Sequence, residues 1–296
     1  MTRSIAFHSY KGGTGKSTIG SNMAALMAMR GLKVVLLDLD VYAPSLQGYF
    51  HWNPKKWIND FLFETAESNE MLEDLTDVLK RFPGVDSNQV KGKLLVGFSN
   101  TSKDEIYRLD GAVRQEASKV QLLRKFIMLR EEIAANHDAD YIIIDTSPGI
   151  RYWSINALAV ADTIFLSLKL DGIDIGGTRI MAREIYDNFT KLGTKSYLLL
   201  NRVAGYCLPP ALNSGQSSDS GTTSQTYSVV LDEQSSVIKK LAGDLDLEII
   251  SSIPCYCDIQ FDSEEYLTVL KHPNHPFTGK INGLINSLES TNSTNR

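Results

Sequence analysis

The nine residues from Tyr10 to Thr18 combine the residue types that bind a phosphate group. They read Y-K-G-G-T-G-K-S-T, with glycines at positions 12, 13 and 15. Glycine lets the backbone approach an anion closely and adopt dihedral angles that a side chain forbids. Lys16 can reach the outer phosphates of a nucleotide, and the hydroxyl group of Ser17 can ligate Mg²⁺. This segment is therefore a candidate site for a nucleotide and its metal ion.

The residues on either side of this glycine loop predict the elements that hold it. Ile5 to Phe7 is a short apolar run typical of a strand, whereas Ile19, Met23 and Met27 recur at helical spacing. In the order strand, loop, helix, the N–H groups of the loop and of the first helical turn point at one place, where the helix dipole favours negative charge. A glycine-rich turn without a ligand is the alternative, and it leaves the order of glycine, Lys and Ser unexplained.

Two carboxylates follow the next apolar run, which reads V-V-L-L-D-L-D from Val34 to Asp40. A continuous branched run is typical of a strand that is covered on both faces of a parallel sheet. Because strand side chains alternate, Asp38 and Asp40 can point the same way at the carboxyl end of the strand, where open α/β sheets bind ligands. Mg²⁺ or a water molecule awaiting activation would explain the pair, and a solvated strand end is the alternative.

A third carboxylate, Asp145, ends the apolar run Y-I-I-I-D that begins at Tyr141, and T-S-P-G follows it. A buried strand that ends in Asp beside a glycine loop of this type is the Walker B arrangement. Its carboxylate accepts hydrogen bonds from the water shell of Mg²⁺ or from the loop serine. The three carboxylates and the glycine loop together predict a site for a nucleotide and Mg²⁺.

The glycine loop departs from the general P-loop pattern, which places a glycine six residues before the lysine. That position is Tyr10 here, and a second lysine, Lys11, follows it. The stretch K-G-G-T-G-K-S therefore resembles the deviant Walker A motif of the ParA/MinD family of ATPases. The resemblance implies that Lys11 reaches across a dimer interface to the phosphates of the partner's nucleotide, so that two ATP molecules lie between two subunits.

The resemblance also implies roles for residues at the strand ends. Asp38 would hold metal-bound water, Asp40 would position the attacking water, and the N–H group of Gly149 in the D-T-S-P-G motif would sense the γ phosphate. Asn201, which ends a further apolar run, would read the adenine edge, with Arg202 enclosing the base. The predicted set comprises Lys11, Lys16 and Asp40 for catalysis, Ser17 and Asp38 for the metal, and Gly12, Gly13, Thr14, Gly15, Lys16, Ser17, Thr18, Asp145, Gly149, Asn201, Arg202 and Pro254 for ATP.

Composition limits the class of protein. The chain has 296 residues, of which 43% are hydrophobic, so it can bury a full core. We predict one P-loop ATPase domain over residues 1–290 and a disordered tail over 291–296. The formal charge of -5 argues against a chain that is basic overall and binds nucleic acid through that charge, although a local basic patch is compatible with it.

Three further features of the sequence predict a cytoplasmic protein. No apolar run is long enough to span a membrane. Strand-like sequence begins too early for a signal peptide. Three cysteines in a chain of this size do not make a disulfide framework.

The alternation of apolar runs and amphipathic segments predicts a doubly wound α/β fold, a mostly parallel sheet flanked by helices. Further strands are expected at Leu94–Phe98, Thr163–Leu168, Ser196–Leu200 and Glu248–Ile253, and helices at Ile58–Phe63, Met71–Leu79, Ala117–Ala135, Tyr152–Ala161, Asp174–Phe189 and Lys280–Leu288. We interpret the last helix as docked on the core, because it has too few basic residues for a membrane anchor. Residues 51–57 are expected to form a loop whose tryptophans cap the core, and residues 208–226 a surface loop.

The sequence leaves several functions open. The favoured one is a Mg²⁺-dependent ParA/MinD-type ATPase that partitions or positions DNA or another cargo through ATP-driven homodimerisation. Non-specific DNA and an activating adaptor protein are candidate partners, and the membrane is a less favoured one. An iron–sulfur cluster carrier is an alternative, because V-Y-A-P-S-L after Asp40 resembles Mrp-type ATPases; those have a C-x-x-C pair, whereas Cys255 and Cys257 are spaced as C-x-C. An ATPase regulator of a membrane or surface machine is a further alternative.

Overall fold

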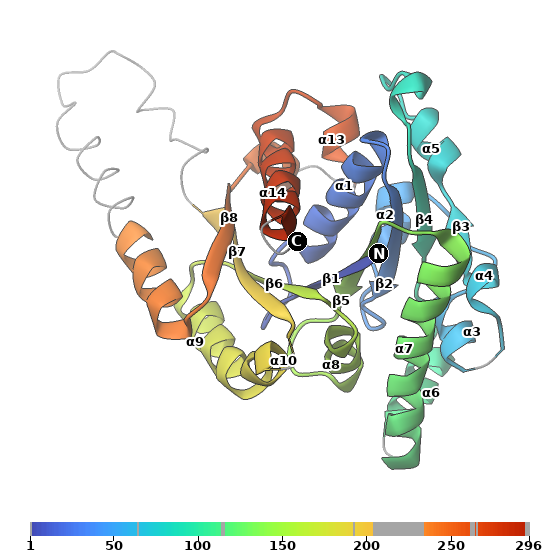
Figure 1. Cartoon of the computed structure of the whole chain (residues 1–296), viewed down its shortest axis with the longest axis horizontal. Coiled ribbons are helices and arrows are strands. Elements are labelled where there is room, and N and C mark those ends of the chain that lie inside the picture. The colour runs from blue at the N-terminus through green and yellow to red at the C-terminus, as the bar shows by residue number, and fades with distance from the viewer. Residues whose placement is uncertain are drawn as a thin grey trace.

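The computed structural model describes residues 2–63, 65–113, 116–191, 193–203, 234–260, 264 and 266–293. The strands in this part of the chain form one eight-stranded sheet in the order β3-β4-β2-β5-β1-β6-β7-β8 (Figure 1). Neighbouring strands are parallel except for β3 and β4. The strands are β1 Arg3–His8, β2 Lys33–Leu39, β3 Leu72–Asp74, β4 Lys93–Gly97, β5 Tyr141–Thr146, β6 Thr163–Leu168, β7 Lys195–Val203 and β8 Glu248–Pro254. The doubly wound, mostly parallel sheet predicted from the sequence is confirmed.

Helices cover both faces of the sheet (Figure 1). One face carries α1 (Lys16–Met29), α2 (Leu46–Phe50), α5 (Thr76–Lys80), α13 (Thr268–Lys271) and α14 (Pro276–Ser293). The other carries α3 (Ile58–Leu62), α7 (Glu116–His137), α8 (Tyr152–Ala159) and α9 (Gly172–Met181). The remaining helical segments are α4 (Ser68–Met71), a 3-10 turn (Ser87–Gln89), α6 (Lys103–Val113), a π-helical turn (Ala182–Tyr186), α10 (Asp187–Lys191), a helix at 234–245 and α12 (Cys257–Gln260).

Two hydrophobic clusters lie between these helices and the two faces of the sheet. Ile5 and Phe7 of β1 belong to the cluster under α1, whereas Ala6 between them belongs to the cluster on the opposite face. The same alternation holds along β2 and β5. The central strands are therefore buried on both sides, and this explains why their sequences are continuous apolar runs.

The order of the strands brings the candidate residues together. β5 lies between β1 and β2, and the register places Asp145 beside Phe7 on one side and beside Asp38 on the other. The chain winds from β1 through β2 and β4, and later crosses to β6 on the far side of β1. Such a reversal opens a crevice at the carboxyl ends of the strands, where ligands bind in α/β sheets.

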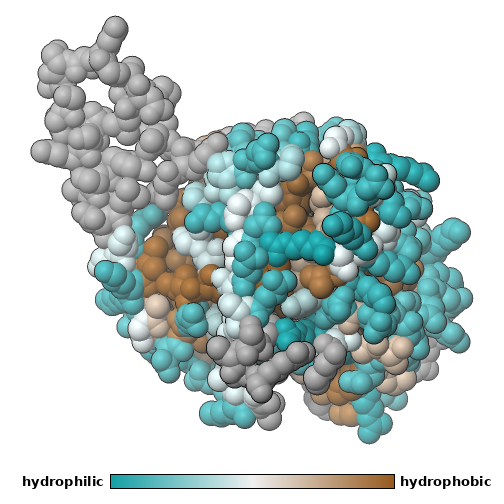
Figure 2. Space-filling view, turned by 45° about the horizontal axis from the view of Figure 1, so that its top comes forward, coloured by the Kyte–Doolittle hydropathy of each residue, from teal (hydrophilic) through white to brown (hydrophobic). Residues whose placement is uncertain are grey.

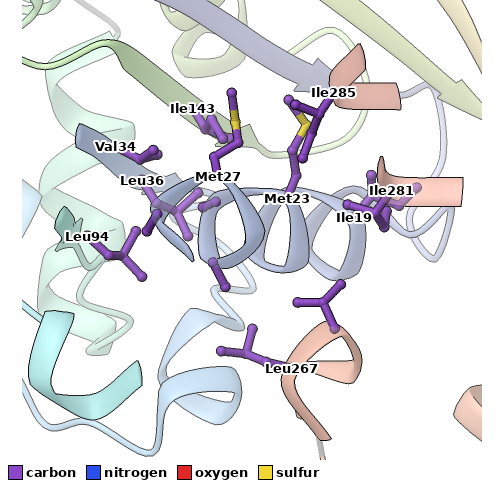
Figure 3. Close-up of a cluster of buried hydrophobic side chains, with 14 of the residues drawn as sticks. Ile19, Met23, Met27, Val34, Leu36, Leu94, Ile143, Leu267, Ile281 and Ile285 are labelled. Carbon is purple, nitrogen blue, oxygen red and sulfur yellow. The ribbon is translucent and has the colours of Figure 1, made fainter. Parts of the chain in front are cut away.

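The helix α14 closes the face of the sheet that carries α1. Its apolar side chains are at most 4% exposed: Phe277, Ile281, Leu284, Ile285 and Leu288. In Figure 3, Ile281 lies beside Ile19 and Ile285 beside Met23 of α1. The prediction of a docked helix is therefore confirmed, as is that of tryptophans that pack on the core, because Trp52 and Trp57 contact the same cluster.

No helix in the described ranges is long and apolar enough to cross a membrane. Figure 2 shows hydrophilic residues over most of one face, with hydrophobic residues gathered in separate patches.

The segment predicted as one helix from Met71 to Leu79 is a short helix, an edge strand and a second short helix. α4 ends at Met71, β3 pairs antiparallel with β4, and α5 follows. The apolar residues Leu75 and Leu79 are both fully buried, but their helical spacing reflects α5 alone. The backbone before α5 joins the sheet instead, since the N–H group of Leu75 donates to the carbonyl of Leu94 at 2.9 Å.

Two other predicted boundaries differ from the structure. The helix expected at Asp174–Phe189 begins at Gly172, because the Asp171 side chain caps it by accepting from the N–H group of Asp174 at 2.9 Å, and the π-helical turn interrupts it. The last helix, expected at Lys280–Leu288, extends as α14 from Pro276 to Ser293. The expected loop at 208–226 and residues 294–296 lie outside the described residues.

Candidate nucleotide-binding site

The glycine loop connects β1 to α1 and has a backbone that requires glycine at two positions. Gly13 and Gly15 have φ angles of 72° and 88°, in the left-handed region that side chains disfavour. Gly15 is also the N-cap residue of α1. A Cβ atom at Gly15 would collide with the side-chain amide of Asn201, so glycine is needed there for space as well.

The side chain of Lys16 is buried inside the loop. The residue is only 5% exposed, and its Nζ donates to Ser9 Oγ at 3.0 Å. Ser9 Oγ in turn donates to the carbonyl of Lys11 at 2.7 Å. Among the described residues its hydrogen bond goes to a neutral hydroxyl group, so this buried ammonium can bind an anion without first giving up a carboxylate partner.

Asp38 and Asp145 are fully buried at the ends of neighbouring strands. Burial raises the pKa of Asp145 to about 6, while the positive charge of Lys16 and the Ser17 hydroxyl group oppose this rise. Burial, together with the charge of Asp145, raises the pKa of Asp38 well above its ordinary value. Two buried acids side by side favour protonation or a bound cation, because their negative charges repel each other in a poorly solvated site.

The oxygens around Asp145 fit Mg²⁺. Neither carboxylate oxygen of Asp145 has a hydrogen-bond partner of ordinary geometry within the described part of the chain. Ser17 lines the adjoining pocket. Mg²⁺ prefers oxygen ligands and keeps several of its own waters, so one or two protein oxygens are sufficient. The donor set is therefore suited to hold the ion directly or through water.

The backbone N–H group of Asp40 donates to Asp38 Oδ1 at 3.1 Å, whereas its side chain contacts the segment after β5. β2 ends at Leu39, and the Oδ1 atom of Asp40 accepts from Ser147 Oγ at 2.7 Å and from the N–H group of Ala43 at 3.3 Å. The N–H group of Gly149, predicted to sense a γ phosphate, donates to the carbonyl of Ser9 at 2.8 Å. The segments after β1, β2 and β5 are thus connected by hydrogen bonds.

The second lysine is held within its own chain. Lys11 Nζ lies 3.6 Å from Asp171 Oδ1, and both side chains are partly exposed. Asp171 also caps α9 through Asp174. Tyr10 packs on the same helix, because a Cβ atom at Gly177 would collide with its ring. Tyr10 and Lys11 distinguish this loop from the general P-loop, and both attach the loop to α9.

The predicted base contacts line a second pocket beside the loop. Asn201, Arg202 and Pro254 lie there together with residues from the C-terminal part of the chain: Ile253, Tyr256, Ile259, Gln260, Glu264, Tyr266 and Phe277. The amide of Asn201 is engaged, however. Its Nδ2 donates to the carbonyl of Thr14 at 2.8 Å, and its Oδ1 accepts from the N–H group of Arg202 at 2.9 Å. In this structure Asn201 braces the glycine loop, and reading a base would require it to exchange these partners.

The phosphate pocket contains several residues that sequence reasoning missed, three of them with large side chains. Tyr42, Tyr49 and Arg151 line it with the glycine loop. The hydroxyl groups of Tyr49 and Thr18 are 2.6 Å apart and share a hydrogen bond. Tyr42 lies in V-Y-A-P-S-L after the D-x-D motif, and Arg151 follows D-T-S-P-G, but these patterns do not show which neighbours turn inward.

His8, at the end of β1, was also missed. It is fully buried, and its Nδ1 lies 2.7 Å from Thr146 Oγ1. Because the Thr146 hydroxyl already donates to the carbonyl of Phe7 at 2.8 Å, the His8 Nδ1–H group is the donor in the other contact. Burial, reinforced by the charge of Lys16, lowers the pKa of His8 to about 3, so the imidazole is neutral.

Cys255 and Cys257 belong to no metal centre among the described residues. Within the described ranges, no group of three or more His, Cys, Asp or Glu side chains is arranged to hold a metal ion. The thiol of Cys255 donates to Gln260 Oε1 at 3.3 Å.

Known proteins resemble this chain in sequence and in fold. Residues 2–192 match the family described as AAA domain. The chain is 25% identical over 183 residues to the chromosome partitioning protein ParA of Caulobacter vibrioides (strain NA1000 / CB15N), covering 62% of each protein. It is 24% identical over 177 residues to the sporulation initiation inhibitor protein Soj of Bacillus subtilis (strain 168), covering 58% of this chain and 60% of Soj. The chain thus spans about three fifths of the length of these relatives.

A solved structure has the same fold. The septum site-determining protein MinD of Pyrococcus horikoshii, complexed with Mg-ADP, superposes with a TM-score of 0.65 at 16% identity, covering 96% of this chain and 94% of that one. The matched domain extends over well over half of the chain and includes the deviant loop and the carboxylates. The chain therefore belongs to this AAA-domain family, within the ParA/MinD group of P-loop ATPases.

Proposed function

We propose that the protein is a Mg²⁺-dependent ATPase of the ParA/MinD type, in which ATP binding drives homodimerisation and hydrolysis reverses it. The observation that carries the proposal is the buried carboxylate of Asp145, without an ordinary hydrogen-bond partner in the described chain, next to the buried ammonium of Lys16. Two pockets share the loop residues Gly15 and Thr18, one lined by the glycines and Lys16 and the other by aromatic and aliphatic side chains. Their chemistry suits phosphates and a base respectively.

The chain's residues would bind and orient ATP rather than bond to it covalently. Bound Mg²⁺ would neutralise charge on the outer phosphates. Lys16 and the loop N–H groups would hold the phosphates, and Ser17, Asp38 and Asp145 would hold the ion directly or through water. Asp40, fixed by its hydrogen bond from Ser147, orients the attacking water.

In this proposal Lys11 acts across the dimer interface, on the nucleotide of the partner subunit. Its ammonium must exchange the Asp171 carboxylate of its own chain for the phosphates of the partner's nucleotide. The exchange costs little, because a partly exposed ion pair contributes only about 0–1 kcal/mol. A contact with a triphosphate in a closed interface is stronger, since less water screens the charges.

The cellular role that we infer is the partitioning or positioning of DNA or another cargo, by one ATPase domain in the cytoplasm. The ParA and MinD relatives support this inference. Two adjacent exposed lysines, Lys239 and Lys240 in the helix at 234–245, offer a local basic contact for DNA phosphates although the net charge is negative. An activating adaptor protein would trigger hydrolysis.

Three measurements test the proposal. Phosphate release from ATP should require Mg²⁺ and stop when EDTA is added. Light scattering should show a dimer with Mg²⁺ and the non-hydrolysable analogue AMP-PNP, and a monomer with ADP. Gel retardation of non-specific DNA and sedimentation with liposomes then show whether the protein binds DNA or a membrane. A protein that neither binds AMP-PNP nor releases phosphate would refute the ATPase function.

A further inference from the structure

We propose that Arg151 binds the γ phosphate of ATP and stabilises the charge that develops during hydrolysis, as an arginine supplied by the same chain. The inference rests on the proposed ATPase function and adds a catalytic residue to it. It assigns a task to a side chain that lies in the phosphate pocket and to which none of the roles above applies.

The position of Arg151 is set by the segment that follows β5. It lies two residues after Gly149, and its N–H group donates to the Gly149 carbonyl at 2.9 Å. Its side chain lines the same pocket as Gly13, Lys16 and Asp40. Arg151 is the N-cap residue of α8, but its side chain makes no capping hydrogen bond. The side chain is therefore not used to cap the helix.

The charges around the guanidinium favour an anionic ligand. Within the described ranges Arg151 forms no ion pair with a carboxylate, whereas Lys11 is paired with Asp171. Its guanidinium carbon lies instead 4.8 Å from the centre of the Tyr42 ring, on the segment that carries Asp40. A cation held by an aromatic face is stabilised by only about 0.5–1 kcal/mol at an exposed site, so a phosphate can readily displace the ring.

The Tyr42 ring is itself held in place. Its hydroxyl group donates to Asp110 Oδ1 of α6 at 2.7 Å. Burial and this carboxylate raise the pKa of Tyr42 to about 12, so the phenol stays neutral and does not compete as an anion for Arg151. The ring therefore keeps the guanidinium at the mouth of the pocket without neutralising it.

Arginine suits the reaction that the pocket would perform. The oxygen of a water molecule bonds to the γ phosphorus as the bond to the β–γ bridging oxygen breaks. The electron pair of the broken bond stays on ADP, and a proton of the water leaves with the inorganic phosphate or passes to solvent. Negative charge shifts onto the bridging and γ oxygens, and the planar guanidinium can contact two of them at once.

The test compares Arg151→Gln and Arg151→Lys with wild type, using Arg81→Gln as the matched control, because Arg81 is an exposed arginine at the end of α5 and lines neither pocket. Calorimetry measures binding of Mg²⁺ with AMP-PNP and with ADP, and phosphate release measures turnover. For Arg151→Gln we expect ADP affinity within about twofold of wild type and AMP-PNP affinity reduced about tenfold, as is typical of one charge-assisted contact. Turnover should fall by at least about a hundredfold, and Arg151→Lys should recover part of it.

The outcomes separate this inference from the function on which it rests. If Arg151→Gln keeps the wild-type ratio of AMP-PNP to ADP affinity and the wild-type turnover, the inference is overturned while the ATPase function stands. If wild type itself binds neither nucleotide, both fail. A variant that melts at a lower temperature without nucleotide but keeps the wild-type affinity ratio would show that Arg151 only supports Tyr42, and would also overturn the inference.

Discussion

The phosphate side and the base side of the candidate site are built in different ways. On the phosphate side, the ends of β1, β2 and β5 meet, and Lys16, Asp38 and Asp145 are buried beneath them. On the base side, the ends of β7 and β8 face side chains from α12 to α14. The first side is fixed by the sheet and by contiguous motifs, whereas the second depends on packing between segments far apart in the chain. Phosphate binding should therefore depend on a few charged residues, and base recognition on many weaker contacts.

The largest expected effect concerns Lys16. Lys16→Ala should weaken binding of Mg-ATP by about a hundredfold, because the buried ammonium makes charge-assisted contacts that water cannot replace. Lys80→Ala is the control, since Lys80 is partly exposed on α5, lies 3.3 Å from Asp77 and lines neither pocket. Calorimetry with AMP-PNP measures both. Wild-type affinity in Lys16→Ala would show that the phosphates bind elsewhere.

Asp40 tests whether the phosphate side contributes to the transition state of hydrolysis as well as to nucleotide binding. Asp40→Ala should bind ATP and Mg²⁺ nearly as wild type does but hydrolyse it at least about a hundredfold more slowly, because a group that orients water acts mainly in the transition state. The variant should accumulate as the ATP dimer in light scattering. Lost nucleotide binding would instead give Asp40 a role in holding the metal.

Lys11 tests whether the site is completed by a second subunit. Lys11→Ala should keep ATP binding by the monomer but lose the shift to dimer on addition of AMP-PNP, together with most hydrolysis. Asp171→Asn is the paired variant. Its amide oxygen can still cap α9, but it lacks the negative charge that attracts Lys11. It should dimerise at a protein concentration a few times lower than wild type. A Lys11→Ala protein that still dimerises fully would refute the role across the interface.

His8 tests how a buried neutral imidazole beneath the phosphate side makes stability depend on pH. Its pKa of about 3 in the folded state lies below the ordinary 6.5, so the unfolded chain takes up a proton that the folded chain does not. The part of the free energy of unfolding that depends on a neutral His8 is complete above pH 6.5. It falls by about 1.4 kcal/mol per pH unit as the pH falls toward 3. The stability difference between wild type and His8→Asn should therefore shrink from pH 7 to pH 5 in urea unfolding without nucleotide. Parallel pH profiles would contradict this.

The smallest effect is expected on the base side. Wild type should prefer ATP over GTP. Because Asn201 braces Thr14 and Arg202, Asn201→Ala should weaken both nucleotides by a similar factor, below about tenfold, corresponding to one or two neutral hydrogen bonds. Competition titrations with ATP and GTP measure the ratio. Selective loss of ATP affinity would show that Asn201 leaves the loop to read adenine.

The sequence predicted the phosphate side because its chemistry is contiguous. Lys16, Ser17 and their glycines occupy one loop, and Asp38 and Asp145 each end an apolar run. The central strands follow from the same runs, since a strand buried on both faces tolerates few polar residues. These features depend only on the local sequence, so they can be predicted without knowledge of the fold.

The remaining parts depend on distances across the fold. The three residues of β3 are too few for a strand signal, and their pairing is decided by the free edge of β4. Tyr256 and Phe277 enter the base pocket because α12 and α14 fold back over the loop. Tyr42 and Arg151 approach each other from the segments that follow β2 and β5, and no motif in the sequence predicts this contact.

The contact between α1 and α14 has a consequence for how the protein is made. Arg30 at the end of α1 bonds to Asn286 of α14, 256 positions later in the chain. Until α14 has been synthesised, the side of α1 that receives Ile281 and Ile285 stays uncovered (Figure 3). Contacts this distant in sequence form late and slow folding. The helix that begins at the glycine loop therefore acquires its final support only after α14 has been synthesised, and a ribosome-bound chain lacking α14 would expose a surface that chaperones recognise.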